Sequence, residues 1–385
     1  MKFIKISILF IYIISNVFLS TGCWNYREIE QLGLAAGVAI DKDEDNNNYI
    51  VTVELINTEP SKGSTKVSSQ LFSSRGKTIF DAVRNLILVT GKKIYWGHTK
   101  VIIINENIAL SGIVPAIDWI NRDSEPRQNT WILISHNITA RDVLNQKLSS
   151  NEVTSIHLNE IIRSQNPIYK FPQMDIWRFR RDISSNTTSA LAPVIKIEKI
   201  NEFTFPKIYG TAVFKKDKLV GYLDGEETMD LLFIRNKIHE GSLILKQTNN
   251  TDTDVSLEIF KSKTKINSTY QNEHFTVNIN INTVVAIDEI AGPQNFIDEP
   301  RRSELEKDAK KLLKTRIENL IKKVQTNYKS DIFGFGNIIE KQHPALWKSI
   351  PYTDETVFSK LQFNVNVDLI IKGSGKISKP IRIGE

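Results

Sequence analysis

The sequence of 385 residues contains a single cysteine, Cys23. A lone thiol forms no internal disulfide, and it excludes the thiolate clusters that hold structural zinc. Long apolar runs are scarce as well, and the run at residues 6–19 is too short to cross the apolar core of a bilayer comfortably. The stability of the folded protein must therefore come from packing.

Motifs for catalysis and for cofactor binding are also missing. The histidines form no pair at metal-ligand spacing and no HExxH sequence, and no GxSxG nucleophile elbow occurs. Gly334 and Gly336 lack the third glycine of a dinucleotide loop, and residues 373–376 depart from the phosphate-loop pattern. No pair of carboxylates stands out for acid and base chemistry. We therefore predict that the protein is not an enzyme and has neither a metal site nor a cofactor.

The charge balance is nearly even for a chain of this size. Lys and Arg number 50 against 44 Asp and Glu, which gives a formal net charge of +6. A bias this weak fits a protein beside an anionic membrane surface and argues against a nucleic-acid partner. Hydrophobic residues make up 41% and charged residues 24% of the chain, ordinary values for folded globular domains.

The first 22 residues have the pattern of a secretory leader. Lys2 and Lys5 form a basic start, residues 6–19 are mostly apolar, and residues 20–22 are small. Because the leader ends directly before Cys23, it resembles a bacterial lipoprotein signal. That resemblance implies cleavage before Cys23, a diacylglycerol on its sulfur, and an acyl chain such as palmitate on its new amino group. Such a set of acyl chains holds a protein firmly on a bilayer.

Two alternatives to the lipoprotein signal remain open. The leucine that usually stands three residues before the cysteine is absent, since Ser20 has that place and Leu19 lies one residue further back. An ordinary signal peptide with a chance cysteine, or an uncleaved anchor, would also fit the pattern. Asn16 within the apolar run argues against an anchor.

The first half of the mature chain alternates between strand and helix patterns. Strands are expected at residues 34–41, 49–56, 67–73, 100–104, 131–134 and 191–197. Helices are expected at residues 24–33, 78–90, 108–121, 140–148 and 153–163. Thr78 is the expected N-cap of its helix, and Pro115 should lie near a helix start. Residues 57–66, which contain Pro, Gly and Ser, are expected to form a loop.

The second half predicts a hairpin and then a sheet with one long helix. The expected elements are a hairpin at residues 209–223, a helix at 226–238, a strand at 241–245 and a polar break at 247–254. Residues 275–281 and 363–369 alternate apolar and polar side chains, so we expect two antiparallel strands of one sheet. Residues 303–328 follow the helical period, with a capping box of Ser303 and Glu306 and a solvated face of lysines.

These elements predict an α+β or mixed α/β fold with several domains, each a mostly antiparallel or mixed sheet with flanking helices. The leader occupies residues 1–22, an N-terminal α/β domain residues 23–200, and a C-terminal α+β domain residues 251–385. Residues 201–250 form either a middle domain with a hairpin and a helix or a part of the C-terminal domain.

Several blocks of the sequence carry a family resemblance. Residues 22–32 read GCWNYREIEQL, with Asn25 in place of the usual acidic residue and Tyr26 in place of a basic one. This opening is similar to the mature start of the C subunits of spore germinant receptors, the Ger(x)C lipoprotein family. Further matching blocks follow in the expected order over essentially the whole mature chain, at residues 97–104, 122–125, 210–221 and 331–336.

The resemblance implies a non-enzymatic accessory subunit. Such a subunit is held by its lipid on the outer face of the spore's inner membrane, beside a transmembrane A subunit and a permease-like B subunit, and it binds no small molecule itself. Trp24 and Tyr26 adjoin the tether, so they either lie at the level of the lipid headgroups or pack on their own domain. A substrate-binding lipoprotein of a transporter is the alternative, since it too would be tethered by lipid.

Overall fold

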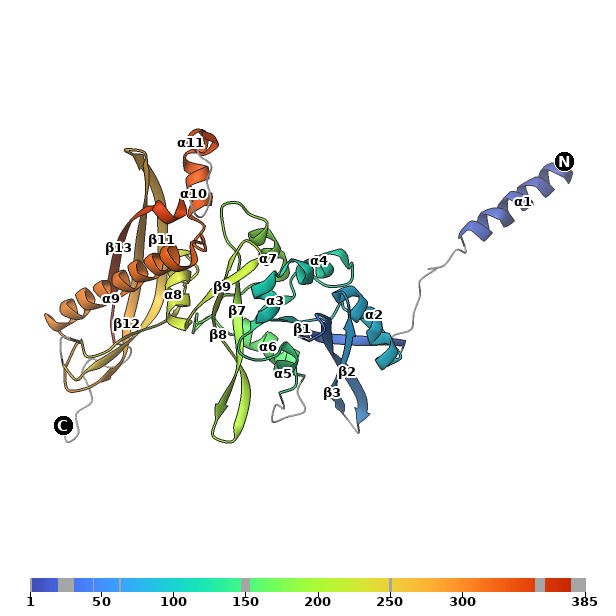
Figure 1. The fold of residues 1–385 in the computed structure, drawn as a ribbon, viewed down its shortest axis with the longest axis horizontal. Coiled ribbons are helices and arrows are strands. Elements are labelled where there is room, and N and C mark those ends of the chain that lie inside the picture. The colour runs from blue at the N-terminus through green and yellow to red at the C-terminus, as the bar shows by residue number, and fades with distance from the viewer. Residues whose placement is uncertain are drawn as a thin grey trace.

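The computed structural model describes residues 2–19, 31–43, 45–61, 64–146, 153–248, 251–349 and 357–374. Its strands form two sheets that lie side by side along the molecule, each with helices packed against it (Figure 1). The predicted α+β class with more than one sheet is confirmed. Helix α1 (Lys2–Leu19) covers most of the expected leader. Among the described helices, none combines the length and the apolar character needed to cross a membrane.

The first sheet has nine strands in the order β3-β2-β1-β5-β6-β7-β8-β9, and β4 pairs with the start of β1. The central neighbours β1, β5, β6 and β7 run parallel, whereas the hairpins β2–β3 and β8–β9 add antiparallel strands at the two ends. The strands are β1 (Leu32–Lys42), β2 (Tyr49–Ser61), β3 (Ser64–Gly76), β4 (Lys93–Tyr95), β5 (Val101–Asn105), β6 (Trp131–Ser135), β7 (Leu191–Ile200), β8 (Phe203–Lys215) and β9 (Lys218–Leu223).

Helices cover both faces of this sheet. Successive residues of β5 point to opposite sides, so Ile102 and Val101 belong to two separate apolar clusters. Helices α5 (Ala140–Leu144) and α6 (Thr154–Arg163) close the cluster that contains Val101. The opposite face is closed by α2 (Ile79–Thr90), α3 (Glu106–Ser111), α4 (Val114–Arg122) and α7 (Ile176–Ile183). As predicted, Thr78 caps α2 and Pro115 lies in the first turn of α4.

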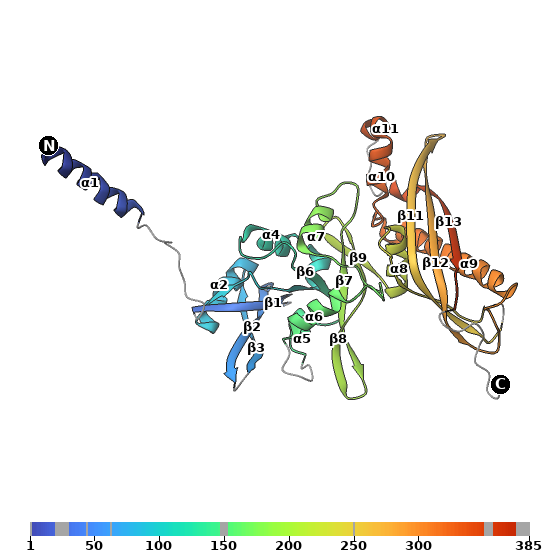
Figure 2. The ribbon, with the colours of Figure 1, turned by 180° about the vertical axis from the view of Figure 1, so that it is seen from behind.

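The second sheet has the order β10-β11-β12-β13 and lies at the far end of the molecule from α2 (Figures 1 and 2). Its strands are β10 (Gly241–Leu245), β11 (Asp254–Gln271), β12 (His274–Ala291) and β13 (Gln362–Ile371). Its helical segments are α8 (Gly225–Ile234), α9 (Arg301–Lys323), a π-helical turn (Val324–Tyr328), α10 (Phe335–Gln342), α11 (Pro344–Ser349) and a 3-10 turn (Phe358–Lys360).

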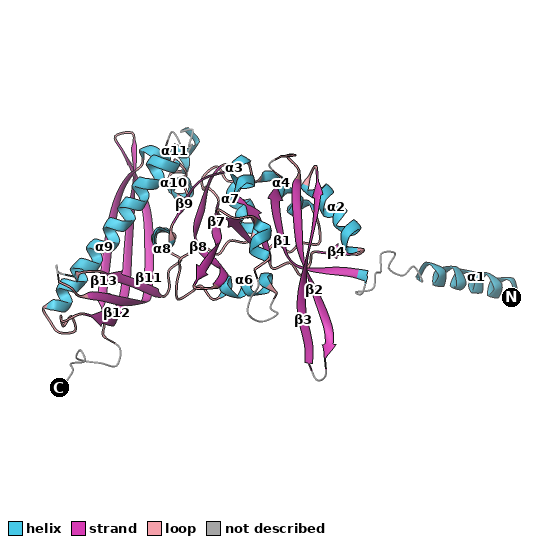
Figure 3. Cartoon of the chain, turned by 60° about the horizontal axis from the view of Figure 1, so that its bottom comes forward, coloured by secondary structure: helices cyan, strands magenta, loops and turns pink. Residues whose placement is uncertain are grey.

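The expected antiparallel pairing of the two alternating strands is wrong. β12 and β13 are neighbours, but they run parallel, with Ile279 opposite Val365. The long helix α9 carries the chain back along the sheet between them, and a strand that follows such a crossover is parallel to the first (Figure 3). The alternation itself is as expected, since Val277 and Ile279 are buried.

The start of α9 also differs from the prediction. The helix begins at Arg301, after Pro300 as N-cap, and no side-chain cap is formed there. Ser303 therefore lies inside the first turn. The carboxylate of Glu306 instead accepts a hydrogen bond from the backbone N–H of Ile371 at 2.8 Å, at the end of β13. The Glu306 carboxylate, which the sequence pattern assigns to a cap at the helix start, is therefore used in a tertiary contact with β13.

Three further differences concern single segments. Residues 57–61 and 64–66, expected in a loop, continue β2 and β3 as a paired ribbon, because backbone pairing of a hairpin needs no apolar side chains. Helix α7 was not predicted, and α8 ends at Ile234, four residues before the expected end. The polar break at 247–254 connects the paired strands β10 and β11.

The segment 201–250 is divided between the two sheets. The hairpin β8–β9 extends the first sheet, whereas β10 opens the second sheet. Helix α8 lies between them, and Phe233 on this helix belongs to the same apolar cluster as Ile104 of the first sheet and Val277 of the second. The two sheets therefore share one continuous core. Where the chain divides into domains stays a prediction.

Candidate functional site

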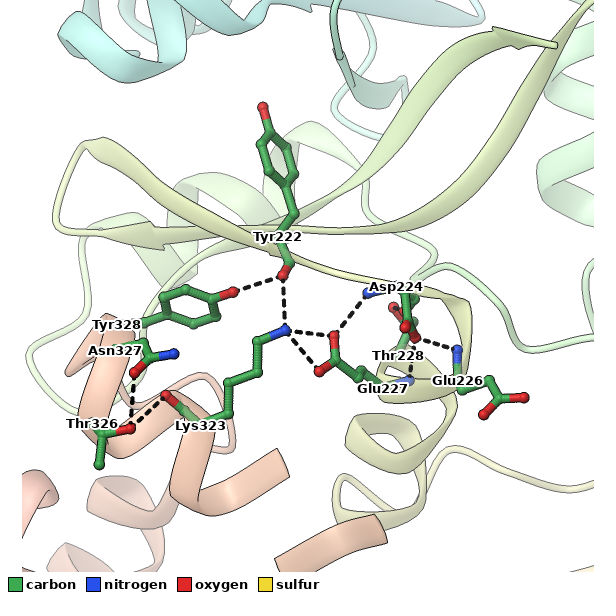
Figure 4. A network of polar contacts seen from close by, with 9 residues as sticks. All are labelled: Tyr222, Asp224, Glu226, Glu227, Thr228, Lys323, Thr326, Asn327 and Tyr328. Carbon is green, nitrogen blue, oxygen red and sulfur yellow. Dashed lines mark hydrogen bonds and ion pairs between the residues drawn. The ribbon is translucent and has the colours of Figure 1, made fainter. Parts of the chain in front are cut away.

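A network of polar contacts lies where the two sheets meet (Figure 4). It brings together the end of β9, the first turn of α8, the last turn of α9 and the π-helical turn. These elements are far apart in the sequence. We call this group of contacts the junction network, and it is centred on Tyr222, Glu227, Lys323 and Tyr328.

The capping box of α8 positions Glu227. The Asp224 carboxylate accepts hydrogen bonds from the backbone N–H groups of Glu226 and Glu227, each at 2.8 Å. The Glu227 carboxylate in turn accepts the backbone N–H of Asp224 at 3.0 Å. This reciprocal arrangement satisfies the free donors at the helix start and fixes the Glu227 side chain toward α9.

Lys323 connects α9 to both α8 and β9. Its Nζ lies 2.7 and 2.8 Å from the two carboxylate oxygens of Glu227, and 3.5 Å from the backbone oxygen of Tyr222. The hydroxyl of Tyr328 donates to that same backbone oxygen at 2.7 Å. Burial is the largest single influence and acts to lower the pKa of Lys323, but the hydrogen bonds and charge interactions with Glu227 and Tyr328 together outweigh it, so the pKa is raised above its ordinary value. The lysine therefore stays charged.

Two glycines near the network occupy positions where another residue would not fit. A Cβ atom on Gly221 would lie 2.3 Å from a ring carbon of Tyr328, so only glycine lets the Tyr328 ring come this close to β9. Gly210 on β8 has a φ of 92°, a conformation that other residues rarely adopt. These two positions give a structural reason for the first and last residues of the block at 210–221.

The side chain of Tyr222 extends the network into the first sheet. Its hydroxyl donates to Glu106 Oε2 at 2.8 Å, and His136 Nδ1 lies 2.8 Å from the same oxygen. The backbone N–H of Asn137 reaches the other oxygen of Glu106 at 2.6 Å. Burial acts to raise the pKa of Glu106, but these three hydrogen bonds together lower it. Burial and the Glu106 charge raise the pKa of Tyr222, so the pair is a neutral phenol bound to a carboxylate.

Two partly buried arginines make contacts on either side of the junction. Arg316 on α9 lies 3.0 Å from the carboxylate of Asp230 on α8. Arg235, the C-cap of α8, donates from Nε to the backbone oxygen of Ile332 at 2.7 Å. Burial lowers the pKa of Arg235, and nearby carboxylates oppose that effect. Charged side chains therefore tie α8 to the segments on both sides of it.

A hollow in the described surface lies elsewhere, between α2, β4 and α4. It has a volume of about 800 Å³ and is lined by Phe80, Trp96 and Trp119 together with charged residues. Four of those charges are paired locally, with Arg122 at 2.7 Å from Asp118 and Glu125 at 2.7 Å from Lys93. No three His, Cys, Asp or Glu side chains gather as metal ligands anywhere in the described ranges.

The predicted tether cannot be placed in this fold. Cys23, Trp24 and Tyr26, and most of the expected helix at residues 24–33, lie outside the described residues. The first described residue after them is Gln31, directly before β1. Lipidation of Cys23 and the location of the two aromatic rings therefore stay predictions.

Comparison with known proteins decides the family. A family model for the N-terminal domain of spore germination proteins matches residues 25–197, and one described as spore germination B3/GerAC like, C-terminal, matches residues 209–375. The chain belongs to this GerAC-like spore germination family. The resemblance to the Ger(x)C proteins is thus confirmed, and the transporter alternative has no support. The first match ends within β7 and the second begins within β8, so the second half of β8 and all of β9 are counted with the C-terminal region although they pair in the first sheet.

Individual relatives match over nearly their full length. Spore germination protein KC of Bacillus subtilis is 24% identical over 97% of both chains, and spore germination protein B3 is 27% identical over 93% of this chain and 95% of its own. Spore germination protein A3 of the same organism is 24% identical, and the match covers 96% of this chain and 98% of its own. The crystal structure of the GerBC protein has the same fold, with a TM-score of 0.60, 23% identity, and coverage of 90% of this chain and all of that one.

The sequence reasoning did not identify the junction network. Lys323 was expected on a solvated face of α9, and its neighbour Lys322 is indeed exposed. Lys323 is instead partly buried, because its ammonium group is paired with the Glu227 carboxylate on α8. No local pattern marks Tyr222 or Glu106, since their partners are about a hundred residues away in the chain.

Proposed function

We propose that this protein is a lipid-anchored, non-enzymatic C subunit of a germinant receptor. In this proposal the chain is tethered through Cys23 to the outer face of the spore's inner membrane. There it assembles with the membrane-spanning A and B subunits and is needed for the spore to respond to nutrients. It transmits or supports a signal and carries out no chemistry of its own.

The single observation that carries the proposal is that both halves of the chain match one spore germination family. The basic and apolar leader that ends before Cys23 supports the tether. The junction network supports a role in which the two halves act together, because a rigid body passes a displacement at one end to the other. Its groups have fixed charge states and strong partners, as expected for structural contacts.

The test uses spores of a strain that carries Cys23→Ala. Their membranes are fractionated, and germination is followed against a panel of nutrients. We expect the protein to leave the inner membrane and the response to one nutrient class to fail, because a single thiol provides the whole tether. Ser20→Leu is the matched control: it restores the usual residue of the lipoprotein signal and keeps Cys23, so location and germination should stay normal.

Two results would count against the proposal in different ways. If Cys23→Ala releases the protein and every nutrient response stays normal, the tether is real but the receptor role fails. If the variant protein stays in the membrane fraction, lipidation of Cys23 is not what holds it there. Mass measurement of the mature N-terminus separates these cases, because it shows directly whether Cys23 carries acyl chains.

A further inference from the structure

Helix α2 has two apolar faces, of which the core covers only one. Ile79, Ala82, Val83 and Leu86 are buried against the first sheet. On the outer side Phe80, Ile87 and Leu88 follow the i, i+7, i+8 spacing of a second stripe. They are 52%, 40% and 84% exposed. A soluble surface helix normally has polar residues in these places, so this exposed apolar face indicates a binding surface.

The charges on α2 and at its two ends are mostly basic, whereas the hollow that Phe80 and Ile87 line also contains Asp118, Asp123 and Glu125. Arg84 lies on the same side of α2, with its guanidinium 4.8 Å from the ring centre of Phe80. Lys77 precedes the helix and Lys92 follows it, and both are exposed. Asp81 is the acidic residue of this helix. Apolar side chains flanked by cations are the composition of a surface that binds anionic lipid headgroups.

The location of α2 relative to the tether favours a bilayer over other coverings. After α2 the chain enters β4, where Lys93 pairs with Leu32 at the start of β1. The end of α2 and the point at which the chain arrives from Cys23 are therefore neighbours, at one end of the molecule (Figures 1 and 2). Eight positions separate Cys23 from Gln31, a reach of at most about 30 Å. A lipid on Cys23 thus keeps this end of the molecule close to the membrane.

We propose that the outer face of α2 docks on the surface of the lipid bilayer. Phe80, Ile87 and Leu88 enter the zone between headgroups and acyl chains, and Arg84 and Lys92 contact anionic headgroups. Phe80 and Ile87 also line the hollow beside α4, so the apolar surface continues inward from the helix. In this orientation the first sheet stands next to the membrane and the second sheet points away from it. The inference rests on the tether of the proposed function and adds the orientation of the body.

The chain offers a clean way to test this, because Cys23 is its only cysteine and the lipid blocks its sulfur. Leu88→Cys introduces one free thiol, and since Leu88 is 84% exposed the change leaves the core intact. The lipidated protein carries an environment-sensitive fluorophore at this site and is bound to vesicles of phosphatidylcholine with a quarter phosphatidylglycerol. Phe260→Cys on β11, where the side chain is 58% exposed in the second sheet, is the matched control.

We expect the label at residue 88 to shift to shorter wavelength and to lose about half its emission when the vesicles carry a nitroxide quencher at the headgroup level. The label at residue 260 should show neither change. Vesicles of phosphatidylcholine alone should weaken the effect at residue 88, because the basic residues then lose their anionic partners.

Flotation with the vesicles separates the failure of docking from the failure of the tether. If the protein floats and both labels report water, the docking is overturned while the tether stands. If the label at residue 88 is shielded only in spore membranes that contain the other subunits, a protein surface covers α2 and the lipid assignment is wrong. If the mature protein does not float and its mass shows no lipid on Cys23, the tether fails and the docking falls with it.

Discussion

Asp230 has an unusual environment for a carboxylate. Its side chain is 4% exposed, and it faces Arg316, whose side chain is 18% exposed, across 3.0 Å between α8 and α9. Burial raises its pKa from 3.8 to about 6, although the charge of Arg316 acts in the opposite direction. The free-energy cost of desolvating the carboxylate thus exceeds its favourable interaction with Arg316, as is common for buried ion pairs.

This imbalance predicts a pH effect on stability. In the unfolded chain Asp230 has an ordinary pKa of about 3.9, so between about pH 4 and pH 6 the folded state holds the proton more tightly. The contribution of Asp230 to the free energy of unfolding should therefore decrease as the pH rises through this window, by about 2 to 3 kcal/mol, and stay constant above it. Chemical denaturation of the wild type and of Asp230→Asn at several pH values measures the difference.

The control for this experiment is Asp368→Asn, which alters an exposed ion pair with Lys310. Its stability difference from the wild type should not follow the same pH window. A pH profile of Asp230→Asn that runs parallel to the wild type from pH 4 to 7 would show that the carboxyl has an ordinary pKa in the folded protein. The other titratable groups contribute equally to the pH dependence of both proteins, so their contributions cancel in the difference.

At the scale of elements, two buried carboxylates of the first sheet cap helices that follow much later in the chain. Asp41 on β1 accepts hydrogen bonds from the backbone N–H groups of Ala140 and Arg141 at the start of α5, at 2.7 and 2.9 Å. Glu54 on β2 does the same for Thr154 and Ser155 at the start of α6, at 2.9 and 2.8 Å. Each carboxylate also faces the positive end of the helix dipole.

Glu54→Gln should therefore lower the free energy of unfolding by about 1 to 3 kcal/mol, since the amide keeps one acceptor and turns N–H donors toward the helix start. Thermal unfolding followed by circular dichroism measures the loss. Glu202→Gln, at an exposed turn, is the control and should change little. Equal unfolding temperatures for the two variants would mean that the Glu54 charge does not hold α6 in place.

Such contacts mark the limit of what the sequence predicts. Periodicity and local capping signals were enough for α2 with Thr78, for the hairpin β8–β9 and for the burial pattern of β12, because their causes lie within a few residues. The parallel pairing of β12 with β13, the use of Glu306 by β13, and the caps from Asp41 and Glu54 depend on partners dozens of residues away. One sequence contains no signal for those distances, and only the family resemblance indicated the function.

At the scale of the whole molecule, α8 links the two sheets. Of its residues Met229 to Ile234 are buried, and the helix contacts strands of both sheets as well as α9. Independent movement of two lobes is expected when their interface is small and polar. Here the interface is apolar at its centre and crossed by the junction network at its edge, which favours a single body with one cooperative unfolding transition.

Phe233→Ala tests that cooperativity. Phe233 is 1% exposed at the centre of α8, so its removal should lower the free energy of unfolding by about 3 to 5 kcal/mol. In hydrogen exchange followed by mass spectrometry, peptides from β5 and from β12 should lose protection by the same amount, because both open only when the shared core opens. Phe260→Ala, where the side chain is 58% exposed, controls for the loss of an aromatic ring and should leave both peptides unchanged. If Phe233→Ala weakens β12 alone, the sheets unfold separately, and a displacement in the first sheet would not reach the second sheet through a rigid core.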